Sequence, residues 1–403
     1  MGTSIGRIKI PESTLVHPND FKGQWWGEDR YPPVKLSEVR ALCIAALRRA
    51  GVAQVDAAFT VETLLDKDLQ GDHLRGISDV PRWAGLFQRG EANPKPKLRV
   101  VRRTKVSALV DDDPEGFYLS ISRQATELCL RMARRNGIAT VAVRKNLGTL
   151  VPIFKMATAA DMVIFGTIQG PPVIAPSGGK KPLIGNNPTG VGIPAGKRHP
   201  VILDIAFSQT SATPVFNAAA TGRPVPSGVL LDSEGEPTTD PLTFAKPSKE
   251  AQGIKASQFS ASQPGSFTSG GSLVPIGGFK GYALALAFGL LTNVLIARHP
   301  KRGEEWGNWY HGSPGTLLIA ISPALFCDLE PFKRAVDKEL SRIVGSTRKK
   351  GVDRIYYPGE RSQELQARGK RLNRVELPSA SREALEKMSR DLKIPADLRT
   401  IRL

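Results

Sequence analysis

The feature that most constrains the fold is a continuous apolar run over 138–143, which directly follows a segment of helical periodicity over 120–136. Gly137 stands between them, and a glycine is a common C-terminal stop for a helix. An apolar, β-branched run without alternation is typical of a strand buried on both faces. A helical pattern over 153–160 and a second strand-like run over 162–167 follow. The sequence therefore predicts that the middle third is an α/β structure.

Further elements flank this middle third. Helical spacing predicts helices over 36–50, 55–69, 281–296 and 379–392, and apolar runs predict strands over 98–110, 189–193, 201–206 and 317–321. Residues 1–33 show no sustained periodicity, and we expect an arm that packs on the body or on a partner subunit. Ser, Gly and Gln fill 248–272, where we expect a mobile loop or lid.

Composition narrows the class of protein. Of 403 residues, 40% are hydrophobic and 23% charged, as in a globular chain. No apolar run reaches the roughly 18–20 residues that cross a bilayer, and the first residues lack the apolar stretch of a secretory signal. Cys43, Cys129 and Cys327 are too scattered for a disulfide framework or a zinc site. We expect a soluble, cytoplasmic protein without a membrane partner.

The chain is strongly basic, with 56 Lys and Arg against 38 Asp and Glu and a net charge of +18. Such a charge suits nucleic acid, a membrane surface or an anionic small molecule. The cations are dispersed along the chain, however. The aromatic residues, 6% of the total, do not interleave with them as a base-stacking platform requires. A well-solvated basic surface is therefore the better interpretation, and we expect no nucleic-acid partner.

Common catalytic and nucleotide-binding motifs are absent. The sequence has no GxGxxG after a strand and no P-loop, which excludes the standard Rossmann and P-loop fingerprints. It also lacks a GxSxG elbow and an HExxH pair, and its five histidines have no metal-like spacing. A generic hydrolase or metal site is not expected.

Four turns rich in Gly, Pro and Asn remain, over 175–179, 185–188, 204–208 and 277–282. Glycines let backbone N–H groups approach an anion closely, and the N-terminus of a following helix adds a favourable dipole. Lys280, just before the long apolar helix, adds a charge for a phosphate. Taken together and in this order, the turns indicate an anion-binding site.

These turns and several other motifs, in this order along the chain, resemble the malate/L-lactate/ureidoglycolate dehydrogenase family, whose relatives include sulfolactate dehydrogenase and the piperideine-carboxylate reductases. The likeness runs from about Val34 to the end of the chain. The matching motifs lie at 136–144, 175–179, 185–188, 204–208, 222–226, 232–241, 273–275, 280–282 and 358–360.

The resemblance implies a fold class and a division into domains. The expected fold is α/β, a non-Rossmann, sulfolactate dehydrogenase-like NAD(P)-binding fold with a helical second domain made from both chain ends. After the arm over 1–33, residues 34–110 and 300–403 would form the helical domain for substrate and dimerisation. Residues 111–299 would form the cofactor-binding domain, with a mobile loop over 245–272. The family habit also implies a homodimer.

The resemblance further implies a nicotinamide cofactor, NAD or NADP, and the basic surface tilts the expectation weakly to NADP. Hydride would pass between the nicotinamide and the C2 carbon of a 2-hydroxy acid, a 2-oxo acid or a cyclic imine acid. The positions matching the family's cofactor motifs are Asn187, Asp204, Ala206, Ser208, Lys280, Gly281, Pro358, Gly359 and Glu360.

The family's catalytic side chains are missing. Aligned on 81–83, Leu74 stands at the family Ser, Arg75 at its acid/base His and Asp79 at its carboxylate-binding Arg. Asn146 falls at the second family His.

Nearby residues offer replacements. His73, two residues before Arg75, shares a face with it if the segment is extended, and is a candidate to replace the missing imidazole. Arg75 is a candidate for binding a carboxylate or an oxyanion. Asp79 is a candidate for a general acid/base or for binding a cationic group.

Two hypotheses follow. The first is an oxidoreductase with a rewired pocket, acting on a carbonyl, hydroxyl or imine substrate. The second is a catalytically silent relative that keeps the fold for binding or assembly. Loss of both His and the Arg motivates the second, but a silent protein should also lose its cofactor turns, and most of them survive. We favour the enzyme.

Overall fold

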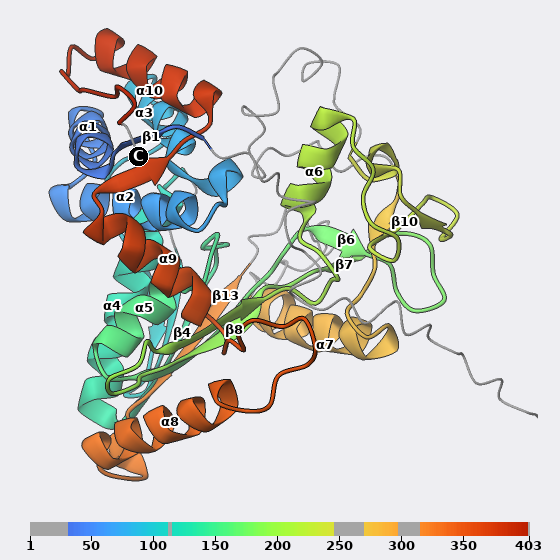
Figure 1. Ribbon diagram of the computed structural model, residues 1–403. Helices are drawn as coiled ribbons and strands as arrows, with labels where there is room; N and C mark the ends of the chain where they lie inside the picture. Colours follow the sequence, from blue (N-terminus) through green and yellow to red (C-terminus); the bar gives the residue numbers. More distant parts are fainter. Residues whose placement is uncertain (1–30, 112–114, 246–269, 297–314, 402–403) are drawn as a thin grey trace, which may run out of the picture.

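The computed structural model describes residues 31–111, 115–245, 270–296 and 315–401 (Figure 1). Its helices are α1 Leu36–Arg49, α2 Gln54–Leu69, α3 Val80–Gln88, α4 Tyr118–Asn136, α5 Val151–Ala159, α6 Ala212–Thr221, α7 Phe279–Gly289, α8 Leu329–Val344, α9 Glu360–Arg371 and α10 Ser379–Asp391, with 3-10 turns η2 His73–Arg75 and η3 Ile77–Asp79 and a π-helical turn η6 Leu290–Val294. Its strands are β1 Pro33–Lys35, β2 Arg99–Arg103, β3 Ser107–Asp111, β4 Ile138–Val143, β5 Val163–Ile168, β6 Pro172–Ile174, β7 Ile184–Gly185, β8 Thr189–Ile193, β9 Val201–Ile205, β10 Leu230–Leu231, β11 Pro237–Thr238, β12 Ser272–Leu273, β13 Thr316–Ile321 and β14 Arg374–Glu376.

A seven-stranded mixed sheet forms the centre of the fold, in the order β2-β3-β4-β13-β5-β8-β9. Only β3 and β4 pair in parallel; the other neighbours are antiparallel. This order differs from a doubly wound parallel sheet. The expected non-Rossmann α/β fold is confirmed.

The junction of α4 and β4 shows how the sequence produces this sheet. Gly137 has a φ of 81° and donates its N–H to the carbonyl of Ala133, which ends α4 at the predicted residue. A Cβ at Gly137 would lie 2.4 Å from a methyl carbon of Leu325, so a larger residue would displace that exposed side chain and would also be strained by the positive φ. The chain reverses at once into β4, whose alternate residues Ala139, Val141 and Val143 are completely buried.

The helical domain is built from both chain ends, as expected. Helices α1, α2 and α3 pack with α10 and with the strand pair β1–β14 around one apolar core (Figure 1). Leu42, Leu47 and Leu65 from the first helices share that core with Leu385 from α10. The register of β1 with β14 joins Pro33 to Glu376. The segment expected to be an arm therefore already belongs to the body at Pro33.

Two further apolar cores lie outside the helical domain. One lies between the sheet and the helices α4 and α5, with Phe154 and Ile153 at its centre. The other is smaller and joins α6, β10, β12 and α7 around Phe207, Phe216 and Phe244. The loop expected over 245–272 lies outside the described residues for 246–269; at its two ends, Ala245 and Leu273 are buried in this small core.

Most predicted elements are confirmed to within two or three residues, with two corrections. The predicted strand over 98–110 is two antiparallel strands, β2 and β3, which are joined by a turn in which the Thr104 hydroxyl accepts from the N–H of Ser107. The helix predicted from Gly281 begins at Phe279 and continues from Leu290 as a π-helical turn. Helices α3, α6, α8 and α9 were not predicted; in α9 the two buried residues, Glu360 and Gln366, are both polar, so no apolar stripe marks it.

The division into domains stays a proposal. The sheet draws β2, nearly all of β3, and β13 from outside the expected range of 111–299. The last strand of the sheet, β9, lies at an edge, where it pairs only with β8. This edge strand is the element around which the predicted site residues gather.

Candidate active site

The predicted cofactor residues lie around β9 and the segment that follows it. At one end, the N–H of Ile202 donates to the carbonyl of Pro358 at 3.2 Å. At the other end, Ser208 forms a β-bridge with Pro275, and the N–H of Ile276 donates to the carbonyl of Phe207 at 3.0 Å. The motifs at 273–275 and 358–360 therefore contact opposite ends of the segment formed by β9 and the 204–208 motif, although they are far apart in the sequence.

The turn before α7 presents an exposed cation. Gly277 and Gly278 have φ angles of 60° and 61°, which glycine adopts without strain, and α7 begins at the next residue. Lys280 is exposed, whereas Gly281 is buried, with no room for a Cβ because one would lie 2.1 Å from the Ile276 carbonyl oxygen. A cavity of about 450 Å³ lies between this turn and residues 175–180. Two of the turns predicted to bind anions thus face one space.

Asn187 and Asn146 have their amide groups engaged by the backbone. Asn187 is fully buried, accepts from the N–H of Gly170 at 2.9 Å and donates to the Ala285 carbonyl on α7 at 2.7 Å. Asn146 accepts from the N–H of Gly148 at 2.6 Å and donates to the Gln169 carbonyl at 2.8 Å. Both side chains hold loops in place, and the functional roles predicted for them stay predictions.

Glu360 is a buried carboxylate with two cationic partners. It is 3% exposed and lies 3.1 Å from Arg354 Nη2 and 3.5 Å from Arg198 Nη1. Gly359, with a φ of 86°, packs its Cα so closely on Ile202 that a Cβ would approach the Ile202 carbonyl oxygen to 2.8 Å. These contacts fix the start of α9 against β9.

Asp204 faces the helical domain. It lies in β9, is half-buried, and accepts a long hydrogen bond of 3.4 Å from the N–H of Leu150 at the start of α5. Burial raises the pKa of the Asp204 carboxyl above its ordinary value, while Lys67, the Leu150 N–H and Arg75 act to lower it. The carboxyl thus lies at the junction between the sheet and the α2–η2 segment.

Lys67, in the last turn of α2, is the group that the sequence-based reasoning missed. Its side chain is 13% exposed, and its Nζ lies 3.9 Å from Asp72 Oδ2. Burial lowers the pKa of this ammonium group, as does the nearby Arg75. No spacing in the sequence marks Lys67, because its partner Asp204 stands far later in the chain.

The predicted geometry of His73 and Arg75 is wrong. Residues 73–75 form the 3-10 turn η2, and in a helix with three residues per turn side chains two apart point in different directions. His73 Nδ1 lies 2.8 Å from Asp68 Oδ1, and the other Asp68 oxygen accepts from the N–H of Ile77 at 2.6 Å. His73 is therefore held against the end of α2.

Arg75 and Asp79 lie on the side of this segment that faces Tyr118. Arg75 Nη2 is 2.8 Å from Asp72 Oδ2, while its Nε is buried without a hydrogen-bond partner. Asp79 accepts from Arg82 Nε at 3.0 Å. Burial, and then the charge of Asp79, raises the pKa of the Tyr118 phenol well above its usual value.

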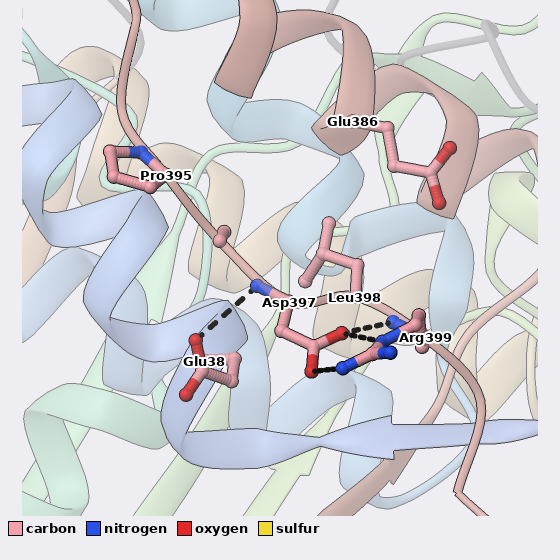
Figure 2. A pocket seen from close by; sticks show the side chains of 7 residues that line it. Glu38, Glu386, Pro395, Asp397, Leu398 and Arg399 are labelled. Atoms are coloured by element: carbon pink, nitrogen blue, oxygen red, sulfur yellow. Dashed lines mark hydrogen bonds and ion pairs between the residues drawn. The ribbon is translucent and has the colours of Figure 1, made fainter.

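A second cavity, of about 580 Å³, lies beside the C-terminal segment and contains none of the predicted site residues (Figure 2). Figure 2 shows carboxylates of Glu38, Glu386 and Asp397 at its wall, with Arg399 held by Asp397 at 2.8 Å. An acidic wall repels an anionic ligand, so this cavity does not suit a dinucleotide.

Neither a membrane-spanning helix nor a metal-binding cluster is present within residues 31–111, 115–245, 270–296 and 315–401. No helix there combines the length and the apolar character needed to cross a membrane. In the same ranges, no group of three or more His, Cys, Asp or Glu side chains is arranged to hold a metal ion.

Comparison with known proteins gives a consistent result. Residues 34–386 match the family described as malate/L-lactate dehydrogenase. The L-sulfolactate dehydrogenase of Methanocaldococcus jannaschii is 29% identical over 337 residues, covering 81% of this chain and 88% of that protein. The (2R)-3-sulfolactate dehydrogenase (NADP(+)) of Chromohalobacter salexigens is 28% identical, with 78% of this chain and 90% of that protein covered. The ureidoglycolate dehydrogenase (NAD(+)) of Escherichia coli O157:H7 is 23% identical, with 82% and 88% covered.

The fold comparison agrees with the sequence comparison. The structure of the sulfolactate dehydrogenase from Methanocaldococcus jannaschii superposes with a TM-score of 0.71 at 28% identity, covering 90% of this chain and 97% of that one. The resemblance expected from the motifs is thereby confirmed, and with it the assignment to the oxidoreductases. The chain belongs to the malate/L-lactate dehydrogenase family.

Proposed function

We propose that the protein is an NAD(P)-dependent oxidoreductase that moves hydride between a nicotinamide and a carbonyl, hydroxyl or imine carbon, in a pocket that differs from the family pattern. The observation that carries this proposal is the position of Asp204. Its carboxyl faces two cations of the helical domain, Lys67 and Arg75, and its strand continues into the 204–208 cofactor motif. Groups for proton transfer and groups for dinucleotide binding therefore meet at one strand.

The residues around β9 fit an anionic dinucleotide. Lys280 has no described carboxylate within ion-pair distance, and a Cβ at Gly278 would meet open space. Both lie at the N-terminus of α7, whose N–H groups and dipole favour a phosphate. Lys280, the glycine turn, 204–208 and 358–360 would hold the cofactor, which supplies a carbon that donates or accepts hydride. Relatives use NADP(+) or NAD(+), and the net charge of +18 favours the additional phosphate of NADP.

On the substrate side, Arg75 is suited to an anionic group. Its guanidinium holds one bond to Asp72 and keeps a buried Nε without a partner, so it has a donor to offer. His73 and Asp79 are the predicted proton-transfer groups, and each is already bonded, to Asp68 and Arg82 respectively. A small 2-oxo acid, 2-hydroxy acid or cyclic imine acid matches this arrangement.

We also propose a homodimer. Along α7 and η6, large apolar side chains are exposed, including Phe279 at 68% and Leu284, Leu290 and Leu291 at 38–46%. A second copy of the chain would cover such a face. Sedimentation velocity of the full chain should give a dimer, and Leu284→Glu should give a monomer; a wild-type monomer at micromolar concentration would contradict the proposal.

The first experiment is titration of the purified protein with NADH and NADPH, followed by nicotinamide fluorescence. Saturable binding in the micromolar range, tighter for NADPH, is expected, and turnover is then measured with 2-oxo acids and cyclic imine acids. Binding without turnover of any of these substrates, or no binding at millimolar concentration, would contradict the proposal and favour the catalytically silent alternative.

A further inference from the structure

We propose that Lys67 is the proton donor and acceptor of this site, in the role that an imidazole has elsewhere in the family. The inference rests on the proposed function and names the group that the altered motif at 74–79 lacks. It begins from geometry. Lys67 lies in the last turn of α2 with its side chain 13% exposed, and the nearest carboxylate oxygen among the described residues, Asp72 Oδ2, is 3.9 Å from its Nζ, too far for a hydrogen bond.

Lys155, a half-buried lysine of the same region, has a different environment. Lys155 Nζ, on α5, lies 2.6 Å from Asp66 Oδ2, which is a full ion pair. Lys67 has only the distant Asp72 carboxylate, because Arg75 Nη2 occupies the same Asp72 oxygen at 2.8 Å. The ammonium group of Lys67 therefore keeps hydrogens to give to a substrate atom.

Charges from every neighbouring element act on Lys67. Its own burial lowers its pKa most, Arg75 on η2 and Lys155 on α5 lower it further, and Asp72 and Asp204 raise it. The result is a pKa below the ordinary value for lysine, nearer to the working pH, where a general acid is most effective. The Asp204 carboxyl, whose own pKa is raised by burial, acts on Lys67 from more than 4 Å away.

The alternative groups are less suited to proton transfer. Arg75 stays protonated at any working pH. His73 Nδ1 is bonded to buried Asp68, and Asp79 is bonded to Arg82 on α3. Of the predicted residues and Lys67, only Lys67 combines a loosely held proton with a position beside the 204–208 segment.

The step balances without an additional reactant. As the substrate carbon receives a hydride, the π electron pair of its C=O or C=N bond moves to the oxygen or nitrogen. That atom takes one proton from the Lys67 ammonium, and the N–H bond electrons stay on Lys67 as a neutral amine. Lys67 regains the proton from solvent; in the oxidative direction, the neutral amine accepts the proton of the substrate hydroxyl or amine.

The first test needs no turnover. Lysine reactivity of the full chain toward acetic anhydride is followed from pH 6 to 11 by peptide mass spectrometry, because only the neutral amine reacts. Lys67 should reach half of its maximal reactivity at a lower pH than exposed Lys338 on α8. Arg75→Gln should raise that midpoint and Asp204→Asn should lower it. A Lys67 midpoint at or above that of Lys338 would overturn the proposal.

The second test is kinetic, with Lys67→Met, Lys67→Arg, His73→Gln and, as a control, Lys338→Met. Lys67→Met should lower kcat by about 100-fold or more with the dinucleotide Kd within threefold, since a general acid contributes roughly 10²–10⁴-fold. Lys67→Arg should not restore kcat, because it keeps the charge but not a labile proton. His73→Gln tests the competing assignment and should lower kcat less than Lys67→Met does, whereas the control Lys338→Met should leave kcat unchanged.

The outcomes separate the two proposals. If Lys67→Met keeps the wild-type turnover, or if turnover is lost in His73→Gln instead, the role proposed for Lys67 is overturned. The proposed function still stands in both cases. Absence of dinucleotide binding and turnover in wild type contradicts the proposed function itself, even if the Lys67 midpoint is lowered.

Discussion

Glu360 and Asp204 are two acidic residues beside the same strand, β9, and their surroundings differ. Glu360 is almost fully buried between the guanidinium groups of Arg198 and Arg354, at 3.5 and 3.1 Å. Asp204 has no described cation within 4 Å; it has one long hydrogen bond from Leu150 and faces Lys67 and Arg75 from further away. Both contacts of Glu360 are made by Oε1, and its Oε2 is buried without a hydrogen-bond partner, but its charge has two cations within 4 Å and the charge of Asp204 has none among the described residues.

This difference distinguishes a carboxylate that stabilises the fold from one that takes part in the reaction. A buried carboxylate held between two guanidiniums has its negative charge compensated, and it orders the start of α9. A carboxyl that is desolvated without close compensation costs stability, and such costs are typical of sites that bind or transform a ligand. If this interpretation is correct, substitutions at Glu360 should affect stability and those at Asp204 should affect turnover.

The largest expected effect is on turnover. Asp204→Asn should lower kcat by about 100-fold, because the amide cannot balance the charges of Lys67 and Arg75 while a proton moves. Initial rates with NADPH and a 2-oxo acid or cyclic imine acid measure this. Glu360→Gln, assayed well below its unfolding temperature, should keep kcat within threefold, and an equal loss in both variants would remove the distinction.

The next effect is on stability. Glu360→Gln should lower the free energy of unfolding by about 2 kcal/mol, less than the roughly 3–5 kcal/mol of a fully buried pair, because Arg198 and Arg354 are partly exposed. Urea unfolding followed by circular dichroism measures it. Glu364→Gln, which removes an exposed partner of Arg354, is the control and should change the free energy by less than about 0.5 kcal/mol.

A smaller effect concerns the cofactor turn. Lys280→Ala should raise the Kd for NADPH about tenfold, as expected for one charge-assisted contact of roughly 1.5 kcal/mol. Nicotinamide fluorescence at two salt concentrations measures it, and the salt dependence should also weaken. Lys338→Ala removes an exposed charge on α8 and should leave the Kd unchanged; an unchanged Kd in Lys280→Ala would exclude Lys280 from the phosphate site.

The smallest expected effect is on how the free energy of unfolding depends on pH. In a Lys67→Met background, Asp204 loses a charge that lowers its pKa, so its carboxyl is even harder to ionise in the folded protein. Below pH 3.8 both the folded and unfolded states are protonated, and Asp204→Asn should then be neutral. As pH rises above 3.8, ionisation penalises the folded state, so Asp204→Asn should become stabilising toward pH 7. A stabilisation that does not change between pH 3.5 and 7 would contradict the raised pKa.

The sequence predicted the fold well where local signals are strong. Strand β4 was predicted at both ends, because a continuous apolar run is bounded by Gly137 and Arg144. Helix α9 was not predicted because its buried residues, Glu360 and Gln366, are polar. Their polar groups are paired with residues distant in the chain. Local periodicity carries no information about such distant partners.

The site was predicted only on the cofactor side. The motifs at 273–275 and 358–360 contact the segment formed by β9 and 204–208, and the cofactor role that the family pattern implies for them stays a prediction. The geometry of His73 was wrong because the path of 73–79 depends on Asp68, whose carboxylate receives the N–H of Ile77 and directs the segment into two short turns. Lys67 could not be identified from the sequence, because charged groups on β9 and α5 act on its pKa and only the tertiary fold brings those elements to α2.

The position of β13 has a consequence for how the protein is made. β13 pairs along its whole length with both β4 and β5, although it follows β5 by about 150 residues and β4 by nearly 180. A ribosome that has delivered the first 300 residues has therefore exposed β4 and β5 with the strand between them still to come. The nascent chain must carry two open sheet edges until residue 321 has emerged, which is when aggregation competes most strongly with folding. Slowing translation just before residue 321 should increase the insoluble fraction of the protein. A chain that ends there lacks the complete β13, so refolding alone cannot restore the sheet.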